Sequence, residues 1–404
     1  MIFRIAWRNI WRNRRRSLIV MISVAIGIIA ALLMDTLSRG MMVQMLENQI
    51  GSHVSHIQIH RKGFRADPVI QNFLPDPQRV QTAVSRLGEI GFWTERVITY
   101  GLLSSAESSS GITLVGIDPT READVTTIKN SVVAGRYLSG ERNEIVIGRK
   151  LAEKLNVTMG DKVVDMATSI DGSVASDVFR VVGLYETFSS EFDKVFAYVD
   201  LAHMQDMLGL RSNVSEVALL VRDRDQLDRV KEELRHELGE SYEVLSYPEI
   251  LPFLVLQLDI FEESMYIFYL IIGIALIFGI INTMLMSVFE RITEFGVLKA
   301  IGMRGRLLVT MVVLEALLLG VLGTVAGFII GYGIYLPLSQ SGIDLSMFAE
   351  SLKSIGSGSV IYPVLTFSGA INALVIIPLV AVLGAIYPAA KAARLQPIEA
   401  IRHV

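Results

Sequence analysis

The sequence predicts a membrane protein with four transmembrane α-helices and a large α+β domain inserted between the first and second helices. Three observations support this fold class. The mean hydropathy of +0.48 and the hydrophobic content of 51% exceed those of an ordinary soluble protein. The apolar residues gather in four runs. Most of the charged residues of the 404-residue chain lie in a single segment between the first two runs.

Each apolar run is about 18 residues or longer, enough to cross the hydrocarbon core of a bilayer as a helix. The four runs are Ser17–Met34, Met265–Val288, Leu307–Leu336 and Leu365–Tyr387. A buried helix of a soluble protein is the alternative for any single run, but four runs in one chain argue against it. The first run exceeds the length of a signal-peptide core and precedes no clear cleavage site. We therefore expect it to remain as an anchor.

The basic residues predict how the chain crosses the membrane. They precede the first run, occupy the link between the second and third runs, and follow the fourth: Arg4, Arg8, Arg12, Arg14, Arg15, Arg16; Arg291, Lys299, Arg304, Arg306; Lys391, Arg394, Arg402. The link between the third and fourth runs has only Lys353, against Asp344 and Glu350. Under the positive-inside rule, both termini and the link 289–306 are cytoplasmic and the inserted domain is periplasmic.

These expectations divide the chain into nine segments of a multi-pass inner-membrane protein. They are a cytoplasmic interfacial helix (1–16), transmembrane helix 1 (17–40), the periplasmic α+β domain (41–262), transmembrane helix 2 (263–288), a cytoplasmic coupling helix (289–306), transmembrane helix 3 (307–337), a short periplasmic link (338–363), transmembrane helix 4 (364–388) and a cytoplasmic tail (389–404).

The charge balance differs between the two sides. The segment 41–262 carries 22 basic and 33 acidic residues, whereas the rest of the chain carries 15 basic and 8 acidic residues. An acidic exterior and a basic cytoplasmic side fit a protein that faces anionic lipid. They do not favour nucleic acid as a partner. The chain has no cysteine, which excludes disulfides and thiolate chemistry.

The inserted domain reads as mixed α and β structure. Strands are predicted at His53–His60, Glu144–Gly148, Phe179–Tyr185, Val195–Val199 and Val214–Val221, and helices at Arg149–Leu155, Leu201–Leu208 and Asp225–Leu238. The histidines of the first strand suggest a metal site, but His56 and His60 would lie ~13 Å apart along a strand. We expect ordinary surface histidines instead.

No catalytic set stands out in the sequence. The phosphate-binding motif GxxxxGK[ST] is absent, so this chain supplies no standard P-loop. No nucleophile or acid–base pair rises above background. We expect a non-catalytic chain with no bound cofactor.

The N-terminal segment Ile2–Arg16 is amphipathic. Phe3, Ala6, Trp7 and Ile10 follow helical spacing, and arginines lie on another face. This pattern favours a helix in the headgroup layer over a simple basic flank.

The third run combines small residues with one acid. Gly323, Gly327 and Gly331 recur every four residues, and Ala316 and Gly320 form a similar pair, which predicts close helix packing. Glu315 would lie ~12 Å into the span and should face other helices or water. A structural hydrogen-bonding or hinge role is favoured over proton relay.

The link between the second and third runs is short and amphipathic. Glu290, Arg291, Glu294 and Lys299 are in helical register, and Arg291 and Glu294 can form an ion pair. Gly302 permits a tight reversal into the third run. The apolar residues Phe295, Val297, Leu298 and Ile301 are expected to be exposed, as in a helix that docks in a groove of another protein.

The segment NTMLMSVFERITEFGVLKAIGMRG resembles the signature of the FtsX/MacB/LolC–LolE permeases, the type VII ABC transporters. The matching residues are Asn282, Ser287, Val288, Glu290, Arg291, Glu294, Gly296, Lys299, Ala300 and Gly302. The end of the chain resembles that family through Pro388, Ala389, Ala392, Ala393, Pro397, Glu399, Ala400 and Arg402. The segment Glu141–Val164 is similar to the core of MacB-type periplasmic domains.

The resemblance implies a mechanism. The link would be a coupling helix seated on a separate ABC ATPase, with Glu290, Arg291, Glu294, Phe295, Gly296, Leu298, Lys299, Ala300 and Gly302 as its coupling residues. ATP and Mg would bind two copies of that ATPase and not this chain. A second permease copy or a paralogue would complete the complex. The motion would reach the periplasmic domains, where cargo moves without crossing the bilayer.

The segment Tyr185–Leu210 resembles the lipoprotein-releasing branch, although Thr187-Phe188 stands where that branch often has Thr-Gly. This resemblance implies extraction of lipoproteins and their transfer to a periplasmic acceptor. It makes four residues candidates for acyl-chain contact, with an aromatic belt as the alternative: Met265, Tyr266, Phe268 and Tyr269. An efflux permease of a MacB-like tripartite system and an FtsX-like signalling scaffold remain alternative functions.

Overall fold

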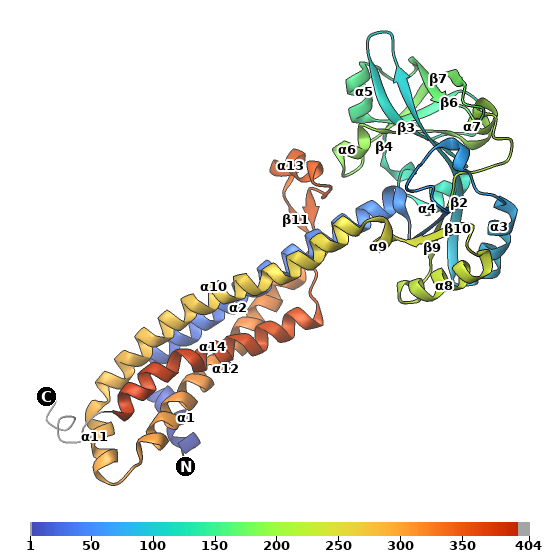
Figure 1. Cartoon of the computed structure of the whole chain (residues 1–404). Helices are drawn as coiled ribbons and strands as arrows, with labels where there is room; N and C mark the ends of the chain where they lie inside the picture. Colours follow the sequence, from blue (N-terminus) through green and yellow to red (C-terminus); the bar gives the residue numbers. More distant parts are fainter. Residues whose placement is uncertain (1, 395–404) are drawn as a thin grey trace. The chain divides into compact units, whose positions relative to one another are not determined.

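The computed structural model describes residues 2–394, apart from the side chain of Glu262 (Figure 1). The chain forms two compact units. The helical unit comprises Met1–Met42, Gln257–Asp344 and Val360–Val404, and the sheet unit comprises Val43–Leu256 and Leu345–Ser359. The expected motif residues Pro397, Glu399, Ala400 and Arg402 lie outside the described residues.

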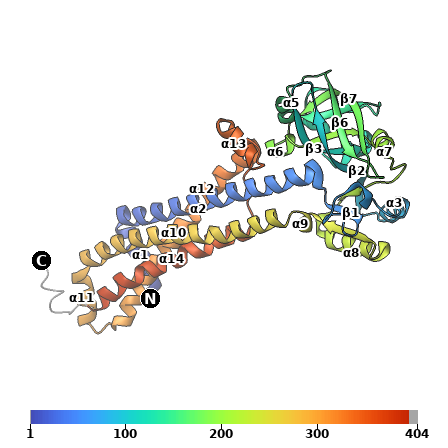
Figure 2. The same ribbon diagram turned by 45° about the horizontal axis from the view of Figure 1, so that its top comes forward.

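Within the described residues, the helical unit is built from six helices. They are α1 (Ile2–Arg12), α2 (Arg14–Gln49), α10 (Pro252–Glu290), α11 (Ile292–Ala300), α12 (Gly305–Ser341) and α14 (Phe367–Ala393). Four of them, α2, α10, α12 and α14, are long and apolar enough to cross a membrane. Figure 2 shows these helices running side by side.

The helix ends differ from the predicted span ends. Helices α2, α10 and α12 extend beyond the ranges 17–40, 263–288 and 307–337 at both ends. Hydropathy marks only the part of a helix that suits lipid, whereas backbone hydrogen bonding continues into polar sequence. Helix α14 begins at Phe367 rather than at residue 364, because the Thr366 hydroxyl accepts a hydrogen bond from the Gly369 backbone N–H and caps the helix.

Small residues bring these helices close together, as predicted. A Cβ placed on Gly327 would lie 2.8 Å from the Cα and carbonyl oxygen of Ala25 in α2. Gly323 and Gly331 also face α2, whereas Gly320 faces Ala381 of α14. The glycine face of α12 therefore packs against two helices of the same chain.

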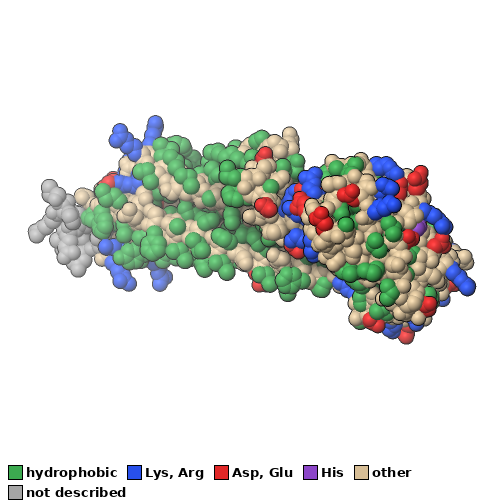
Figure 3. Space-filling model, turned by 90° about the horizontal axis from the view of Figure 1, so that it is seen from above, with side chains coloured by type: hydrophobic (Ala, Val, Ile, Leu, Met, Phe, Trp, Pro, Cys, Tyr) green, Lys and Arg blue, Asp and Glu red, His purple; other side chains and the backbone are tan. Residues whose placement is uncertain are grey.

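The outer surface of the helical unit is apolar. On the face drawn in Figure 3, hydrophobic side chains predominate, and Lys and Arg side chains gather near one end of the helices. Large apolar side chains such as Phe278 and Ile329 are mostly exposed. A surface of this kind suits contact with lipid.

The sheet unit contains one ten-stranded sheet. Its strands are β1 (Ile57–Arg61), β2 (Ile90–Ser104), β3 (Ser109–Ile117), β4 (Val132–Gly135), β5 (Glu144–Gly148), β6 (Lys162–Thr168), β7 (Val174–Tyr185), β8 (Phe196–Asp200), β9 (Glu216–Val221) and β10 (Tyr242–Ser246). The strand order is β10-β1-β9-β2-β3-β8-β5-β7-β4, and β6 pairs with β2 and β7. Most pairs are antiparallel, while β3–β8 and β5–β7 are parallel.

Short helices pack around this sheet. They are α3 (Pro77–Arg86), α4 (Pro119–Val125), α5 (Arg149–Leu155), α6 (Ser190–Asp193), α7 (Leu201–Leu208), α8 (Leu227–Leu238), α9 (Tyr247–Ile250) and α13 (Ala349–Ser354), with the π-helix η1 (Ile50–Val54) and the 3₁₀ turns η2 (Ile70–Asn72), η3 (Lys129–Ser131), η4 (Arg224–Gln226) and η5 (Ser346–Phe348). The predicted strand at Glu144–Gly148 and the helices at Arg149–Leu155 and Leu201–Leu208 are confirmed.

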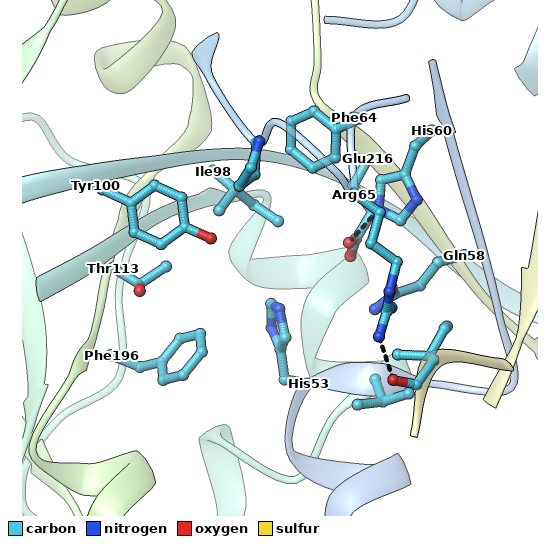
Figure 4. Close-up of a pocket in the computed structure, with 13 residues that line it drawn as sticks. His53, Gln58, His60, Phe64, Arg65, Ile98, Tyr100, Thr113, Phe196 and Glu216 are labelled. Atoms are coloured by element: carbon cyan, nitrogen blue, oxygen red, sulfur yellow. Dashed lines mark hydrogen bonds and ion pairs between the residues drawn. The ribbon is translucent and has the colours of Figure 1, made fainter. Parts of the chain in front are cut away.

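The strand predicted over His53–His60 is only partly correct. The chain stays helical through Val54, and β1 begins at Ile57. The prediction of surface histidines is wrong for His56 and His60, which are both buried. Their rings find partners on β9: the His56 Nδ1 accepts a hydrogen bond from the Val221 backbone N–H at 3.0 Å, and the His60 Nε2 lies 2.9 Å from the Glu216 Oε2 (Figure 4). Among the described residues, no group of three His, Asp or Glu side chains could hold a metal ion.

The link between α12 and α14 has structure of its own. A two-stranded ladder, β11 (Ile343–Asp344) with β12 (Val360–Ile361), closes it. Between these strands, residues 345–359 belong to the sheet unit. There Lys353 forms an ion pair with Glu186, which also lies 3.0 Å from the Arg149 guanidinium.

Candidate coupling site

Helix α11 is a separate short helix between α10 and α12. The backbone breaks from helical geometry at Arg291, which precedes α11. After α11, Gly302 adopts φ +99°, a conformation that favours glycine. The Met303 N–H donates to the Leu298 carbonyl and the Gly302 N–H to the Lys299 carbonyl, both at 3.0 Å. The predicted reversal at Gly302 is therefore confirmed.

One face of α11 is buried in the helical unit. Phe295 is only 1% exposed and belongs to the same apolar core as Ile10 of α1 and Leu308 of α12. The prediction that Phe295 is exposed is wrong, because this ring is part of the core of the bundle. Gly296 is buried as well, and Leu298 is half-buried.

The opposite face of α11 remains open. Ile301, just after the helix, is 77% exposed, and Val297 is 46% exposed, as the sequence predicts. Glu290 and Ala300 are also exposed. This open face gives α11 a small apolar surface bordered by polar groups.

Arg291 anchors the start of α11 from inside the bundle. Its Nε lies 3.0 Å from the Glu294 Oε2, which confirms the predicted ion pair. Its Nη1 lies 3.1 Å from the Oε2 of Glu315 in α12, and both side chains are buried. The guanidinium also lies 5.0 Å from the centre of the Phe295 ring. Glu315 thus has the structural, hydrogen-bonding role that the sequence favours.

Two arginines at the start of the chain extend this ionic network. The Arg12 Nη2 lies 2.7 Å from both carboxylate oxygens of Glu294, and Arg16 forms an ion pair with Glu290. Partial burial would raise the pKa of Glu294, but the hydrogen bonds from Arg12 and Arg291 outweigh it and hold the pKa below its usual value. Glu294 therefore stays ionised at neutral pH.

Helix α1 presents two apolar surfaces. Ala6 and Ile10 are buried in the helical unit. Phe3 and Trp7, which the sequence places on the same face, are exposed together with Trp11. The exposed aromatic residues keep the surface that an interfacial helix needs.

The far end of α11 is tied to α14. The Lys299 Nζ donates to the Ala393 carbonyl oxygen at 2.8 Å. The Lys391 ammonium of α14 lies 4.8 Å from the centre of the Phe289 ring, near the end of α10. Contacts with α1, α12 and α14 therefore hold α11 as part of one block, and a force applied to its open face would act on several helices.

Sequence reasoning missed Arg12, Arg16 and Lys391 as parts of this site. Arg12 and its partner Glu294 are 282 residues apart. The one feature of the sequence that could have indicated Arg12 and Arg16 is the excess of arginines before the first span. The positive-inside rule already explains this excess, so it does not point to ion pairs with α11.

The four residues proposed for acyl-chain contact divide into two pairs on α10. Met265 and Tyr269 are buried beside Ala31 of α2. Tyr266 and Phe268 are exposed. Met265 and Tyr269 therefore pack between helices, and only the other two side chains are available to lipid.

Comparison with known protein families shows which family the chain belongs to. The profile described as "MacB-like periplasmic core domain" matches residues 17–237, and the profile described as "FtsX-like permease C-terminal" matches residues 266–397. The chain belongs to the MacB/FtsX family of ABC transporter permeases. It is a multi-pass inner-membrane protein, as these permeases are.

Curated permeases of this family resemble the chain over most of its length. The "Lipoprotein-releasing system transmembrane protein LolC" of Xylella fastidiosa (strain Temecula1) is 26% identical over 71% of this chain and 72% of the relative. The "Macrolide export ATP-binding/permease protein MacB" of Bdellovibrio bacteriovorus is 26% identical over 97% of this chain, which spans 60% of that relative. The extracellular domain of the transporter YknZ from Gram-positive bacteria, a solved structure, is 19% identical with a TM-score of 0.36, covering 48% of this chain and 100% of that domain.

Proposed function

We propose that this permease works with two copies of a separate ABC ATPase and extracts lipoproteins from the inner membrane. The observation that carries the first part is α11, a short helix whose buried face is fixed to three other helices and whose open face presents Val297 and Ile301. An apolar helix face of this kind fits a groove on a partner protein. ATP and Mg would bind the ATPase, and this chain would transmit the resulting movement.

This proposal includes an orientation. Both termini and α11 face the cytoplasm, where the ATPase is, and the sheet unit faces the periplasm. The basic ends of the membrane helices support it through the positive-inside rule. A second permease, either another copy or a paralogue, would complete a symmetric or pseudo-symmetric pair around the two ATPase subunits.

Lipoprotein extraction is supported by the similarity to LolC. Tyr266 and Phe268, exposed near the start of the apolar part of α10, would contact the acyl chains, and a periplasmic acceptor would receive the cargo.

Export is the second candidate function, because the MacB relative, a macrolide exporter by name, matches 97% of this chain. A signalling scaffold like FtsX is the third.

A pull-down from mild detergent, analysed by mass spectrometry, tests both parts of the proposal. We expect the native chain to retain an ABC ATPase and acylated lipoproteins. Ile301→Asp should lose the ATPase, because a charge replaces the most exposed apolar side chain of the open face. Met347→Asp is the matched control, since Met347 is also highly exposed, at 90%, but lies in the sheet unit.

The outcomes separate the candidates. Recovery of a periplasmic adaptor in place of lipoproteins would support export. An ATPase that binds the Ile301→Asp variant as tightly as the native chain would remove α11 from the coupling role. The absence of any ATPase from the native complex would refute the mechanism.

A further inference from the structure

Helix α1 carries an exposed aromatic stripe that the coupling site does not use. Phe3, Trp7 and Trp11 recur every four residues, so they lie along one side of the helix. Their exposed fractions are 56%, 39% and 50%. The rings of Trp7 and Trp11 meet edge to face, with 6.1 Å between their centroids. Large apolar rings that gather on a surface mark contact with lipid or with a partner protein.

Two arginines run beside this stripe. Arg4 and Arg8 are exposed and lie four residues apart, and each directly follows a residue of the stripe in the sequence. The arginine side is therefore rotated from the aromatic side by one residue of the helix, about 100°. Within the described part of the chain, neither guanidinium forms an ion pair or a hydrogen bond, whereas Arg12 pairs with Glu294. Two positive charges without a carboxylate partner thus lie next to apolar rings.

The position of α1 in the helical unit fits the surface of a bilayer. Ile10 on its buried side belongs to the same apolar core as Leu308 and Met311, which lie in the first two turns of α12. The apolar part of α12 begins there, so α1 lies at the level where a membrane span meets the polar layer. Figure 1 shows α1 at the same end of the helical unit as α11. The aromatic and arginine sides are left to face the surroundings.

The sides of α1 follow one another in an order that suits a phospholipid. Going round the helix, the aromatic stripe is followed by Arg4 and Arg8 and then by Arg12, whose partner Glu294 lies in α11. Rings at the level of the acyl chains would place Arg4 and Arg8 at the level of the phosphates. Guanidinium groups bind phosphate through charge-assisted, paired hydrogen bonds. A headgroup with net negative charge is favoured, because a zwitterionic headgroup adds a positive charge of its own.

We propose that α1 binds anionic phospholipid through an aromatic–arginine surface made of Phe3, Arg4, Trp7, Arg8 and Trp11. The rings lie among the acyl chains, and the two guanidinium groups bind the phosphate. The proposal requires a chain that sits in a membrane and does not depend on the proposed transport function. Lipid bound to this surface would contact the same block of helices that holds α11.

The test measures quenching of tryptophan fluorescence in lipid nanodiscs that contain the full chain. The nanodiscs hold an equal, minor fraction of either phosphatidylglycerol or phosphatidylcholine with brominated acyl chains, in a bilayer of unbrominated phosphatidylcholine. Bromine atoms quench only the indole rings close to them. The chain has three tryptophans, so the Trp7→Phe/Trp11→Phe variant measures the contribution of Trp93 alone. We expect brominated phosphatidylglycerol to quench Trp7 and Trp11 more strongly than brominated phosphatidylcholine, by a factor of about 2 or more.

Charge variants and salt test the role of the arginines. The Arg4→Gln/Arg8→Gln variant should abolish the difference between the two lipids, because it removes both free charges and keeps the rings. The Arg304→Gln/Arg306→Gln variant is the matched control, since it removes two exposed arginines at the start of α12, outside α1, and it should keep the native ratio. Sodium chloride at about 0.5 M screens the charges and should lower the ratio in the native chain.

Three results would overturn the proposal. They are equal quenching of the native chain by the two brominated lipids, an equal loss of selectivity in the two arginine variants, or no quenching of Trp7 and Trp11 by either lipid. The last result would assign the aromatic stripe to a partner protein instead. If the Arg4→Gln/Arg8→Gln variant fails to fold, the salt series on the native chain takes its place, and unchanged selectivity at high salt would also count against the proposal. Both leaflets of a nanodisc have the same composition, so no outcome depends on which side of the membrane α1 faces.

Discussion

Two of the ion pairs around α11 should differ greatly in strength. The Arg291–Glu315 pair is buried, with side chains 7% and 8% exposed. The Arg12–Glu294 pair is about half exposed at both partners, although its distances are shorter. We therefore predict that Arg291→Met destabilises the protein severely and that Arg12→Met does not.

The expected magnitudes follow from burial. Arg291→Met leaves the Glu315 carboxylate inside the helical unit without its arginine. Breaking a buried pair in this way costs ~3–5 kcal/mol. We expect a loss of about 3 kcal/mol. Arg12→Met removes an exposed pair, for which ~0.2–1 kcal/mol is typical.

A double variant distinguishes the effect of losing the ion pair from the effect of changing the shape of the side chains. Arg291→Met with Glu315→Leu removes both charges and fills similar space, so it should recover most of the stability lost in Arg291→Met. Thermal unfolding in detergent, followed for the native chain and the three variants, measures these differences. Equal destabilisation by Arg291→Met and Arg12→Met would refute the argument, and so would a double variant no more stable than Arg291→Met.

Two further predictions concern helix packing and pH. Gly327→Leu should disrupt the contact of α12 with α2, because its Cβ would meet the Ala25 backbone at 2.8 Å; Gly333→Leu on the same helix meets no atom within 4 Å and should leave assembly unchanged in size-exclusion chromatography. Burial raises the pKa of Asp165 to about 7, and the carboxylate has no hydrogen-bond partner within the described residues. The folded state then keeps a proton that the unfolded chain releases near pH 4, so stability should fall as the pH rises from about 4 to 7, by at most roughly 4 kcal/mol. Asp165→Val should abolish this slope in melting curves recorded from pH 4 to 8, and an unchanged slope would assign the pH dependence to another group.

Local sequence patterns predicted the parts of the fold that depend on neighbours along the chain. Gly302 marked the turn after α11, and the four-residue spacing of Gly323 and Gly327 marked a close helix contact. The Arg291–Glu294 pair was also visible because it spans one helical turn. In each case the physical cause lies within a few residues.

The sequence-based predictions of exposure are wrong where the residue that buries a side chain is distant in the sequence. The sequence predicts Phe295 on the surface, but this ring belongs to a core that also includes Ile10 of the first helix. His60 was expected on the surface, but Glu216 on β9 provides a buried partner. Nothing in the sequence marks Arg96 as buried, because arginine is usually exposed and its two carboxylate partners come from α4 and β9.

The separation between Arg12 and Glu294 has a consequence for biosynthesis. The ribosome makes Arg12 and Arg16 almost 300 residues before the acids that pair with them, since Arg12 and Glu294 are 282 positions apart. During translation of the sheet unit, these arginines have no carboxylate partner from α11. In the proposed orientation these arginines face the cytoplasmic leaflet, whose anionic lipid phosphates are groups that guanidinium binds well. Membrane phospholipid composition should therefore affect how efficiently newly made chains acquire their final ionic contacts.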